Sequence, residues 1–370
     1  MKYDFLIVGA GFAGSVLAER IATQLNKKVL IVEKRNHIGG NAYDEYDEYG
    51  ILVHRYGPHI FHTNDKNVVD YLSNFTEWYE YHHKVLAYSN NEYFPIPINR
   101  TTINKVFNKN FTCDYEVEEF IKGIREERTP IKNSEDIIVN QVGYKLFEKF
   151  FLHYTKKQWN LEPKYLSPSV CGRIKFRTNN DDRYFEDTYQ IMPKDGFTKM
   201  FEKMLSNKNI EIKLGVDYKD LININSINFD FIIYTGPIDY YFDYKFGKLS
   251  YRSIKFEYKN FNVESFQPSS VVNFVDSDVP FTRVTEYKKI TNQKINSTTI
   301  SYEYPNSSDE PYYPILIDSN LSKLKLYLDE ANKIQNLILC GRLAEFRYYD
   351  MHQVVARALN IFENRIRKLF

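Results

Sequence analysis

The sequence has few of the features that build metal centres, disulfide frameworks and membrane spans. Only three of its 370 residues are cysteines, and Cys113, Cys171 and Cys340 occur without CxxC or histidine spacing. This pattern indicates neither a cysteine-ligated metal site nor a disulfide framework, and it fits a reducing compartment. No run of about 18 apolar residues occurs, and a strand pattern begins soon after Met1, so we expect neither a membrane span nor a signal peptide. The formal net charge of +1 provides no global attraction to nucleic acid or membranes.

The first forty residues carry the most informative motif in the chain. An apolar run at 5–8 predicts a buried strand, and the turn Gly9-Ala10-Gly11-Phe12-Ala13-Gly14 follows it at once. A helical pattern then runs to about residue 25, and a second strand at 29–32 ends in Glu33. This order of strand, glycine turn, helix, strand and acid is the context in which the glycine motif binds a dinucleotide.

Each group in this motif has a physical role. Gly9 allows the tight turn, Gly11 lets the backbone approach a pyrophosphate, and Gly14 lets helix and strand pack closely. The helix N-terminus offers N–H groups to the phosphates, and Glu33 can accept from a ribose hydroxyl. A second glycine pair, Gly39 and Gly40, suggests that the backbone folds back along a long cofactor, which favours FAD over NAD.

The rest of the chain alternates between strand and helix patterns. Residues 84–98 predict a hairpin that turns at Asn90-Asn91, and its prolines suit an edge strand. The patterns further along predict helices over 115–124, 135–142, 144–153 and 197–205, and a C-terminal helix that begins at Asp350. They predict strands at 189–192, 210–214, 231–234 and 337–339, and an antiparallel sheet over 250–304. Residues 160–183 are predicted to form a long loop that is functional or disordered.

The length predicts two or three domains. We therefore expect an α/β protein in which a discontinuous Rossmann-like FAD-binding domain carries an inserted helical bundle and an inserted antiparallel β-sheet domain. The expected ranges are 1–80 with 189–235 and 330–370 for the FAD-binding domain, 100–183 for the helical domain with a mobile loop at 160–183, and 81–99 with 236–329 for the substrate-binding sheet.

Two groups of residues suit a nucleotide substrate. Tyr154 and Trp159 stand at a helix end, where full burial is difficult, and suit stacking on a planar ring such as uracil; the alternative is an ordinary aromatic core. Guanidinium groups match phosphate oxygens, so the scattered arginines are candidate diphosphate ligands, although each one taken alone fits a solvated surface. These arginines are Arg173, Arg177, Arg252, Arg283 and Arg342.

Two further features have a functional and an ordinary interpretation. Asp350 stands where it can cap the C-terminal helix, and Met351 would then lie under a flavin, because a helix N-terminus stabilises the negative charge of a reduced flavin. The ordinary alternative is a capped helix. His59 and His62 could exchange protons in a site, or they could be hydrogen-bonded loop histidines.

At several places the chain resembles the bacterial UDP-galactopyranose mutase family, from residue 3 to about residue 358 and least over 100–140. The segments that carry the resemblance are KRNHIGGNAY at 34–43, HIFHTN at 59–64, TGPID at 235–239, FDY at 242–244, EPYYP at 310–314, GRLAE at 341–345 and YYDMHQ at 348–353. The resemblance implies a cytoplasmic enzyme, commonly a homodimer, that interconverts UDP-galactopyranose and UDP-galactofuranose for surface glycans. It also implies a non-redox ring contraction that requires reduced FAD, in which flavin N5 attacks the anomeric carbon and displaces UDP.

The resemblance assigns substrate-binding roles residue by residue. Arg173 matches a mobile-loop arginine and Arg283 the fixed arginine opposite it, so these two are expected to hold the diphosphate and to be catalytic. Tyr313, Tyr348 and Tyr184 match tyrosines at the phosphates. Tyr154, Thr155 and Trp159 match the uridine side, with Phe150 as their packing neighbour. Arg252, Asn273 and Glu303 match residues at the sugar end. His83 stands where the family often has an asparagine that contacts the nucleotide.

The cofactor-binding residues follow from the glycine motif and the resemblance together. His59 matches a histidine near the flavin, Arg342 and Asp350 match ribityl–diphosphate and ring contacts, and Val216 and Asp217 match the segment beside the adenine. The complete expected set is Gly9, Gly11, Phe12, Ala13, Gly14, Glu33, Lys34, Gly40, Asn41, His59, Ile60, Val216, Asp217, Gly341, Arg342, Tyr349, Asp350 and Met351, with no metal ligand.

The chain departs from the family pattern in the predicted loop and near the flavin. Residues 173–177 read Arg-Ile-Lys-Phe-Arg and lack the family's proline, which leaves open whether Arg173 or Arg177 is the main arginine of the mobile loop. Pro58 replaces a small residue before His59.

Three other classes of protein remain as alternatives: an amine-oxidase-like flavoprotein, an NAD-dependent dehydrogenase and a non-enzymatic nucleotide-binding scaffold. Oxygen consumption with an amine would indicate the first, absence of flavin absorbance the second, and absence of turnover in any redox state the third.

Overall fold

A five-stranded parallel sheet forms the nucleotide-binding end of the molecule. In the computed structural model, which describes residues 2–172, 175–223, 227–306 and 310–370, this sheet has the order β10-β2-β1-β11-β17. Its strands are β1 (Lys2–Val8), β2 (Val29–Glu33), β10 (Ile210–Leu214), β11 (Asn228–Tyr234) and β17 (Leu337–Leu339). Every neighbouring pair is parallel, and strands from both ends of the chain therefore meet in one sheet.

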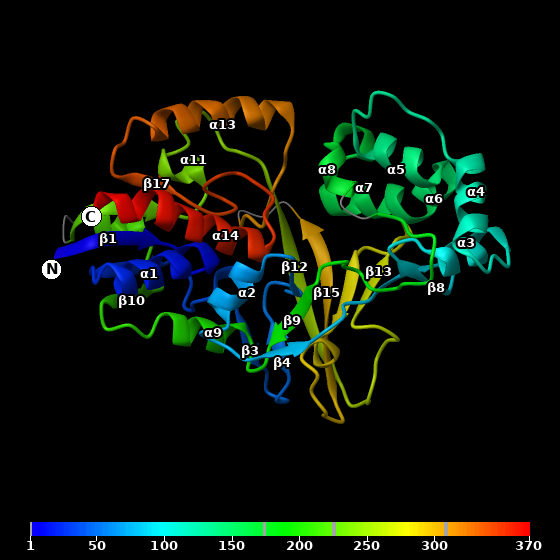
Figure 1. The fold of residues 1–370 in the computed structure, drawn as a ribbon, viewed down its shortest axis with the longest axis horizontal. Coiled ribbons are helices and arrows are strands. Elements are labelled where there is room, and N and C mark those ends of the chain that lie inside the picture. Colours follow the sequence, from blue (N-terminus) through cyan, green and yellow to red (C-terminus); the bar gives the residue numbers. More distant parts are fainter. Residues whose placement is uncertain (1, 173–174, 224–226, 307–309) are drawn as a thin grey trace.

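Helices cover both faces of this sheet, as its nearly continuous apolar strands require. Phe5 and Ile7 of β1 face a core shared with α1 and α14, whereas Leu6 faces a second core that includes the end of α13. Figure 1 shows α13 and α11 on one side of the sheet and α1 on the other. The helices of this part are α1 (Phe12–Gln24), α2 (Lys66–Leu72), α9 (Phe197–Met204), α10 (Tyr218–Asn223), α11 (Ile238–Tyr241), α13 (Asp318–Ala331) and α14 (Met351–Ile361), which continues through η4 (Phe362–Ile366) and η5 (Arg367–Leu369).

A seven-stranded sheet of order β16-β12-β15-β14-β13-β7-β8 occupies the centre of the molecule. Its strands are β7 (Val85–Ser89), β8 (Glu92–Ile96), β12 (Tyr251–Phe261), β13 (Val271–Phe274), β14 (Arg283–Glu286), β15 (Thr298–Asn306) and β16 (Tyr313–Pro314), with α12 (Tyr287–Ile290) between β14 and β15. The predicted hairpin is confirmed: Asn90 and Asn91 both have positive φ, and β8 with its Pro95 is an edge strand. The expectation of a purely antiparallel sheet is wrong at one place, since β13 pairs with β7 in parallel.

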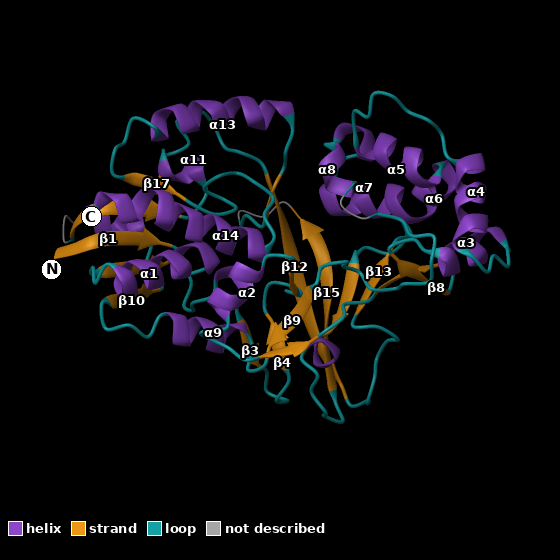
Figure 2. Ribbon diagram, viewed as in Figure 1, coloured by secondary structure: helices purple, strands orange, loops and turns teal. Residues whose placement is uncertain are grey.

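A third part is entirely helical and lies at the opposite end from the parallel sheet (Figure 2). It contains α3 (Arg100–Phe107), α4 (Asp114–Ile124), α5 (Ser134–Val142), α6 (Tyr144–Phe147), the π-helical segment η2 (Glu148–Leu152), α7 (His153–Trp159), η3 (Pro163–Tyr165) and α8 (Pro168–Cys171). Local sequence explains these helices well: Asn133 caps α5 by accepting from the Asp136 N–H at 2.8 Å, and Glu116 accepts from the Cys113 N–H at 3.1 Å at the start of α4. The predicted loop over 160–183 is wrong in part, because η3 and α8 lie within it.

Two small sheets and one short turn connect these parts. β3 (Asp44–Tyr46) pairs with β4 (Leu52–His54), and β9 (Tyr189–Pro193) lies between β5 (Phe61–Thr63) and β6 (Trp78–Glu80), while η1 (Gly40–Ala42) follows β2. We propose that the three ranges predicted from the sequence divide the chain into these nucleotide, helical and sheet parts, except that α11 and α13 of the range 236–329 pack against the parallel sheet. Among the described residues, no helix is long and apolar enough to cross a membrane.

Gly9 is expected to be among the least replaceable residues of the fold. Its φ is +101°, and a Cβ on Gly9 would lie 2.1 Å from Thr235 Oγ1. We therefore expect Gly9→Ala to lower the free energy of unfolding by about 2–3 kcal/mol in urea denaturation. Gly123 in α4 is the matched control: its Cβ would meet nothing within 4 Å, so Gly123→Ala should raise stability by up to about 1 kcal/mol. Equal effects of the two changes would contradict this account.

Candidate functional site

Glu33 organises the end of the parallel sheet where a dinucleotide would bind. Glu33 is 8% exposed, and its two carboxylate oxygens accept from the backbone N–H groups of Ala10 at 2.9 Å and Arg35 at 2.8 Å. Each oxygen has two lone pairs. The carboxylate therefore fixes the glycine turn and the segment after β2 and retains capacity to accept from ribose hydroxyls.

The backbone around the glycine turn fits a pyrophosphate. A Cβ on Gly40 would lie 2.9 Å from Gly11 Cα, so the two glycine segments approach each other more closely than side chains would allow. Gly11 is the N-cap of α1, and no described side chain caps this helix end. The first N–H groups of α1 therefore suit an anion, and the residues present fit a dinucleotide cofactor.

The other predicted cofactor residues lie around this cradle. The Val216 N–H donates to the Glu33 carbonyl at 3.0 Å, and Asp217 accepts from Tyr240 Oη at 2.7 Å, so this segment lies beside the ribose-binding acid. Asn41 accepts from Arg35 Nη1 at 2.9 Å, whereas the Lys34 side chain is exposed. Phe12 is buried against Phe201 of α9, and Ile60 and Met351 are half-buried against the same core.

The start of α14 meets the glycine turn from the other end of the chain. Asp350 is the N-cap of α14, as predicted, and its N–H donates to Gln353 Oε1 at 3.0 Å. A Cβ on Gly341 would lie 3.1 Å from Ala13 Cβ, which places the segment after β17 directly against α1. Arg342 is thereby fixed beside the cradle, and its guanidinium donates to the Tyr349 carbonyl.

Arg342 also contacts an aromatic platform. Tyr313 and Tyr348 are stacked, with ring centroids 5.4 Å apart and an interplanar angle of 13°, and the Arg342 guanidinium carbon lies 5.3 Å from each centroid. Trp159 of α7 lies 6.5 Å from Tyr313. These contacts connect the cofactor side of the site to the helix that carries the predicted uridine-binding residues.

One row of the central sheet brings three predicted polar residues together. The strand register aligns Asn273 of β13 with Arg283 of β14, and Arg283 with Glu303 of β15. Arg283 Nε donates to Asn273 Oδ1 at 3.2 Å, and Arg283 Nη1 lies 3.6 Å from Glu303 Oε2. Arg283 Nη2 donates to Tyr154 Oη at 3.3 Å, so α7 closes over this row.

The ion pair keeps Arg283 charged. Burial by itself lowers the pKa of Arg283, but the attraction of Glu303 outweighs it, and the pKa lies well above its ordinary value. Glu303 is only 2% exposed, and a Cβ on Gly57 would lie 3.7 Å from its Oε1. The loop that carries His59 therefore packs directly over the sheet row.

Two predicted histidines are held neutral. Burial lowers the pKa of His59 to about 3, and burial together with the charge of Arg283 lowers the pKa of His83 to about 3. His59 Nδ1 lies 2.9 Å from the Gly57 carbonyl oxygen, and His83 Nδ1 lies 3.2 Å from Tyr81 Oη. Neither imidazole acts as a cation near neutral pH.

The remaining substrate residues lie around the Arg283 row. Arg252 is buried on β12, where it pairs with Tyr313, and its Nε donates to the Gln158 carbonyl at 2.8 Å. The Tyr184 ring lies 5.7 Å from that of His83. Phe150 and Thr155 are buried, and both contribute packing. The ring centroids of Phe150 and Phe94 lie 5.3 Å apart, and Thr155 Oγ1 lies 3.7 Å from Cys171 Sγ.

Arg173 and Arg177 are the two loop arginines that could bind the diphosphate. Arg173 lies outside the described residues. Arg177 is 8% exposed, and its guanidinium bonds to Glu186 Oε1 at 3.1 Å and to the carbonyls of Asp181 and Arg183. Arg177 therefore anchors its own segment. His62 Nδ1 lies 2.8 Å from Asp187 Oδ2, and its ring stacks on Phe185.

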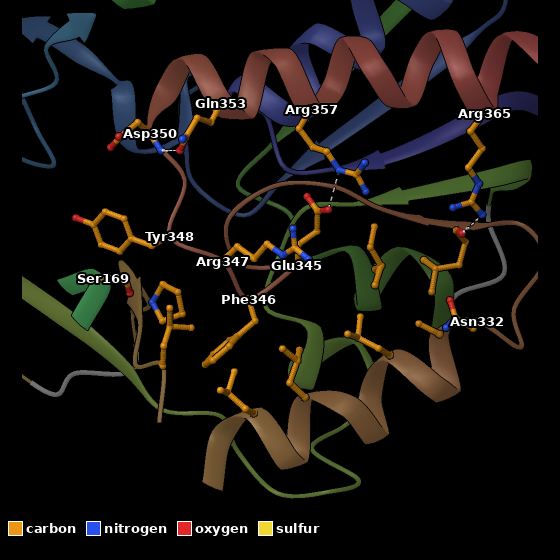
Figure 3. A pocket seen from close by; sticks show the side chains of 18 of the residues that line it. Ser169, Asn332, Glu345, Phe346, Arg347, Tyr348, Asp350, Gln353, Arg357 and Arg365 are labelled. Carbon is orange, nitrogen blue, oxygen red and sulfur yellow. Dashed lines mark hydrogen bonds and ion pairs between the residues drawn. The ribbon is translucent and has the colours of Figure 1, made fainter. Parts of the chain in front are cut away.

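A cavity of about 810 Å³ borders the aromatic platform. Leucines of α13 and β17 line one side, Trp159 and Tyr348 belong to its wall, and Figure 3 shows Arg347, Arg357 and Arg365 around it. Arg357 bonds to Glu345 Oε1 at 2.8 Å, and Arg365 donates to the Leu337 carbonyl at 2.8 Å. These two arginines are therefore engaged by the protein itself.

Sequence reasoning missed three residues that shape the site. Thr235 Oγ1 donates to the Val8 carbonyl at 2.7 Å beneath the glycine turn. Arg35 lies 4.0 Å over the Tyr56 ring and pairs with Glu310 at 2.5 Å, which connects the segment after β2 to the segment that leads to Tyr313. Lys157 of α7 donates to backbone carbonyls near Arg283. The sequence could have pointed to Thr235 and Arg35, because both lie in segments that resemble the family.

The fold and the glycine cradle define a protein with a Rossmann-like dinucleotide-binding domain, and residues 7–75 match the model for NAD(P)-binding Rossmann-like domains. Residues 149–348 match the UDP-galactopyranose mutase family model. The chain belongs to the UDP-galactopyranose mutase family.

Individual relatives agree with this assignment. The chain is 38% identical to a UDP-galactopyranose mutase of Mycoplasma genitalium, over 96% of this chain and 92% of the relative. It is 37% identical to a dTDP-fucopyranose mutase of Escherichia coli, over 96% of each chain. A crystal structure of reduced UDP-galactopyranose mutase shares the fold, with a TM-score of 0.78 at 15% identity over 100% of this chain and 95% of that chain.

The neutral state of His83 predicts how stability responds to acid. In the unfolded chain a histidine takes up a proton below about pH 6.5, whereas the folded chain accepts one on His83 only near pH 3. Stability should therefore be complete above about pH 6.5 and fall as the pH decreases, by up to about 1.4 kcal/mol per pH unit for this one proton. In His83→Asn, urea unfolding measured from pH 4 to 7 should show a shallower decline. His82→Asn, at an exposed neighbour, is the control and should keep the wild-type slope.

Proposed function

We propose that this protein is a UDP-galactopyranose mutase, an isomerase that interconverts UDP-galactopyranose and UDP-galactofuranose by a non-redox ring contraction and requires reduced FAD. The observation that carries the proposal is the meeting of Arg283, Asn273, Glu303 and Tyr154 beside a dinucleotide cradle. A fixed, permanently charged guanidinium at this place suits a substrate whose leaving group is a diphosphate. Membership of the family supports the same reaction.

The cofactor would be held by elements from both ends of the chain. Glu33 would accept from the ribose, the N–H groups of α1 would meet the pyrophosphate between Gly11 and Gly40, and the start of α14 would face the ring system. When bound and reduced, FAD would supply the nucleophile, flavin N5, for the anomeric carbon of the sugar. His59, which is neutral, would place an uncharged imidazole near that ring.

The nucleotide must be retained while it is detached from the sugar, and the chain supplies suitable groups. Arg283 would hold the diphosphate together with Arg173, since Arg177 is engaged elsewhere. The hydroxyl groups of Tyr313, Tyr348 and Tyr184 would donate hydrogen bonds to phosphate oxygens. Their partners Arg342 and His83 fix the positions of these rings.

The two ends of the substrate would lie on different elements. Tyr154, Thr155 and Trp159 of α7 would form the uridine side, with Phe150 behind them in the helical core. Arg252, Asn273 and Glu303 of the central sheet would line the sugar end. Because α7 contacts the sheet through Arg283, the helix and the sheet can fix both ends relative to each other.

One relative favours a second candidate substrate. The dTDP-fucopyranose mutase of Escherichia coli matches this chain about as well as the UDP-galactopyranose mutases do. Its name specifies a different base and a sugar without the galactose 6-hydroxyl. The same Arg283 row could serve either nucleotide sugar, because both carry a diphosphate.

Product analysis with the purified holoprotein decides among these possibilities. The protein would be incubated with UDP-galactose, UDP-N-acetylgalactosamine or dTDP-fucose, with and without dithionite reduction, and the products separated by chromatography. We expect furanose formation from UDP-galactose only after reduction. Isomerisation confined to dTDP-fucose would replace the substrate, and oxygen consumption with an amine would replace the reaction class.

The role of Arg283 can be tested separately from the cofactor. We expect Arg283→Ala to lower kcat/KM by at least about a hundredfold with the flavin still bound, because a charged contact to the diphosphate is lost while the cradle around Glu33 is untouched. Arg125→Ala, at an exposed position of the helical part, is the control and should leave kcat/KM unchanged. Loss of flavin from Arg283→Ala, or a near-wild-type rate, would contradict the assignment.

The resemblance extends the proposal to assembly and location. We propose a cytoplasmic homodimer that supplies galactofuranose donors for cell-surface polysaccharide. Light scattering of the purified protein would test the dimer.

A further inference from the structure

Lys157 of α7 places its ammonium group inside a ring of backbone carbonyls. Its Nζ donates to the carbonyls of Phe274 and Asp276 at 2.8 Å, Val279 at 3.0 Å and Phe281 at 3.2 Å. An ammonium has three N–H donors, so four carbonyls use its whole donor capacity. A lysine placed in this way ties a loop to a helix and takes no part in a surface ion pair.

The loop in question connects β13 to β14 and ends at the diphosphate site. Its first caged carbonyl belongs to Phe274, the neighbour of Asn273, and its last belongs to Phe281, two residues before Arg283. The Phe274 N–H donates to the Thr282 carbonyl at 2.9 Å, which closes the loop at its base. The carbonyl ring therefore lies directly behind the Arg283–Asn273 contact.

The same helix also contacts Arg283 directly. Tyr154 precedes Lys157 by three residues, so the two side chains lie on one face of α7. Tyr154 Oη accepts from Arg283 Nη2 at 3.3 Å, while Lys157 holds the loop from which Arg283 extends. One turn of α7 thus fixes both the guanidinium and the backbone behind it.

The far side of the loop is held by the neighbouring hairpin. Asp276 accepts from Ser89 Oγ at 2.7 Å and from the Asn90 N–H at 3.0 Å. The loop is therefore held between the β7–β8 turn on one side and α7 on the other. Release of Lys157 would free the side that faces the nucleotide-binding helix.

The charge of Lys157 is sensitive to pH. Burial lowers its pKa to about 8, and the carboxylates of Asp276 and Asp278 act in the opposite direction. A deprotonated amine has one donor fewer and directs a lone pair toward carbonyl oxygens, which repel it. The tie should therefore be intact below about pH 8 and weaken above it.

We infer that Lys157 is a positioning residue that fixes Arg283 against Tyr154 at the diphosphate end of the site by caging the β13–β14 loop. The inference rests on the proposed function, because it takes the Arg283 row to be the place where the nucleotide sugar binds. It assigns to Lys157 no contact with substrate or cofactor. Its effect is to hold the guanidinium where a diphosphate requires it.

A pair of adjacent lysines provides the test. In the FAD-loaded protein, Lys157→Met should weaken UDP binding measured by calorimetry and raise KM, each by about tenfold or more, with unchanged flavin content. Lys156→Met is the matched control, since Lys156 lies on the same helix, is exposed and pairs only loosely with Glu162 at 3.5 Å. Unchanged UDP affinity in Lys157→Met would overturn the inference.

The pH profile separates positioning from simple stabilisation. Wild-type kcat/KM should decline above about pH 8, and Lys157→Arg, which stays protonated, should lack this decline even if its rate at pH 7 is lower. The same decline in Lys157→Arg would contradict the inference, and this comparison also decides the matter if Lys157→Met fails to fold. If the wild-type protein isomerises no nucleotide sugar, the proposed function fails, whereas the UDP-binding comparison still tests Lys157.

Discussion

The site depends on one ion pair between the partly buried Arg283 and the buried Glu303. Arg283 lies within the central sheet between the side chains of Asn273 and Glu303, and Glu303 is almost completely buried. A guanidinium in such a place is tolerable only because a carboxylate lies beside it and oxygen acceptors take its N–H groups. The same arrangement holds the cation rigidly in place, and rigidity is what a diphosphate-binding group needs.

The helix α7 connects the proposed uridine-binding side of the site to the central sheet, which carries the proposed sugar-binding end. Contacts between the helix and the central sheet include Tyr154 with Arg283, Lys157 with the loop before Arg283, and the Gln158 carbonyl, which accepts from Arg252. A π-helical segment, η2 (Glu148–Leu152), leads directly into α7. The aromatic platform then connects the helix to Arg342 and so to the cofactor cradle.

Much of the fold could be predicted because its signals are local. The strand–glycine–helix pattern, the Asn90-Asn91 turn and the Asp350 cap all depend on neighbouring residues, and the structure confirms each of them. The helices η3 and α8 were missed because they are single turns without a period to detect. The parallel pairing of β13 with β7 was missed because alternation of apolar residues does not specify strand direction.

By itself the sequence determined the dinucleotide motif and the family, because both are written in contiguous residues. Only the tertiary structure decided that Tyr154 and Arg283, 129 residues apart, share a hydrogen bond, and that Asp44 caps α9 by accepting from the Phe197 N–H at 2.7 Å. It also decided that Arg177 is an anchor and that Lys157 cages a loop. The physical reason is that a side chain's partners are set by the path of the whole chain, which local propensity and spacing do not encode.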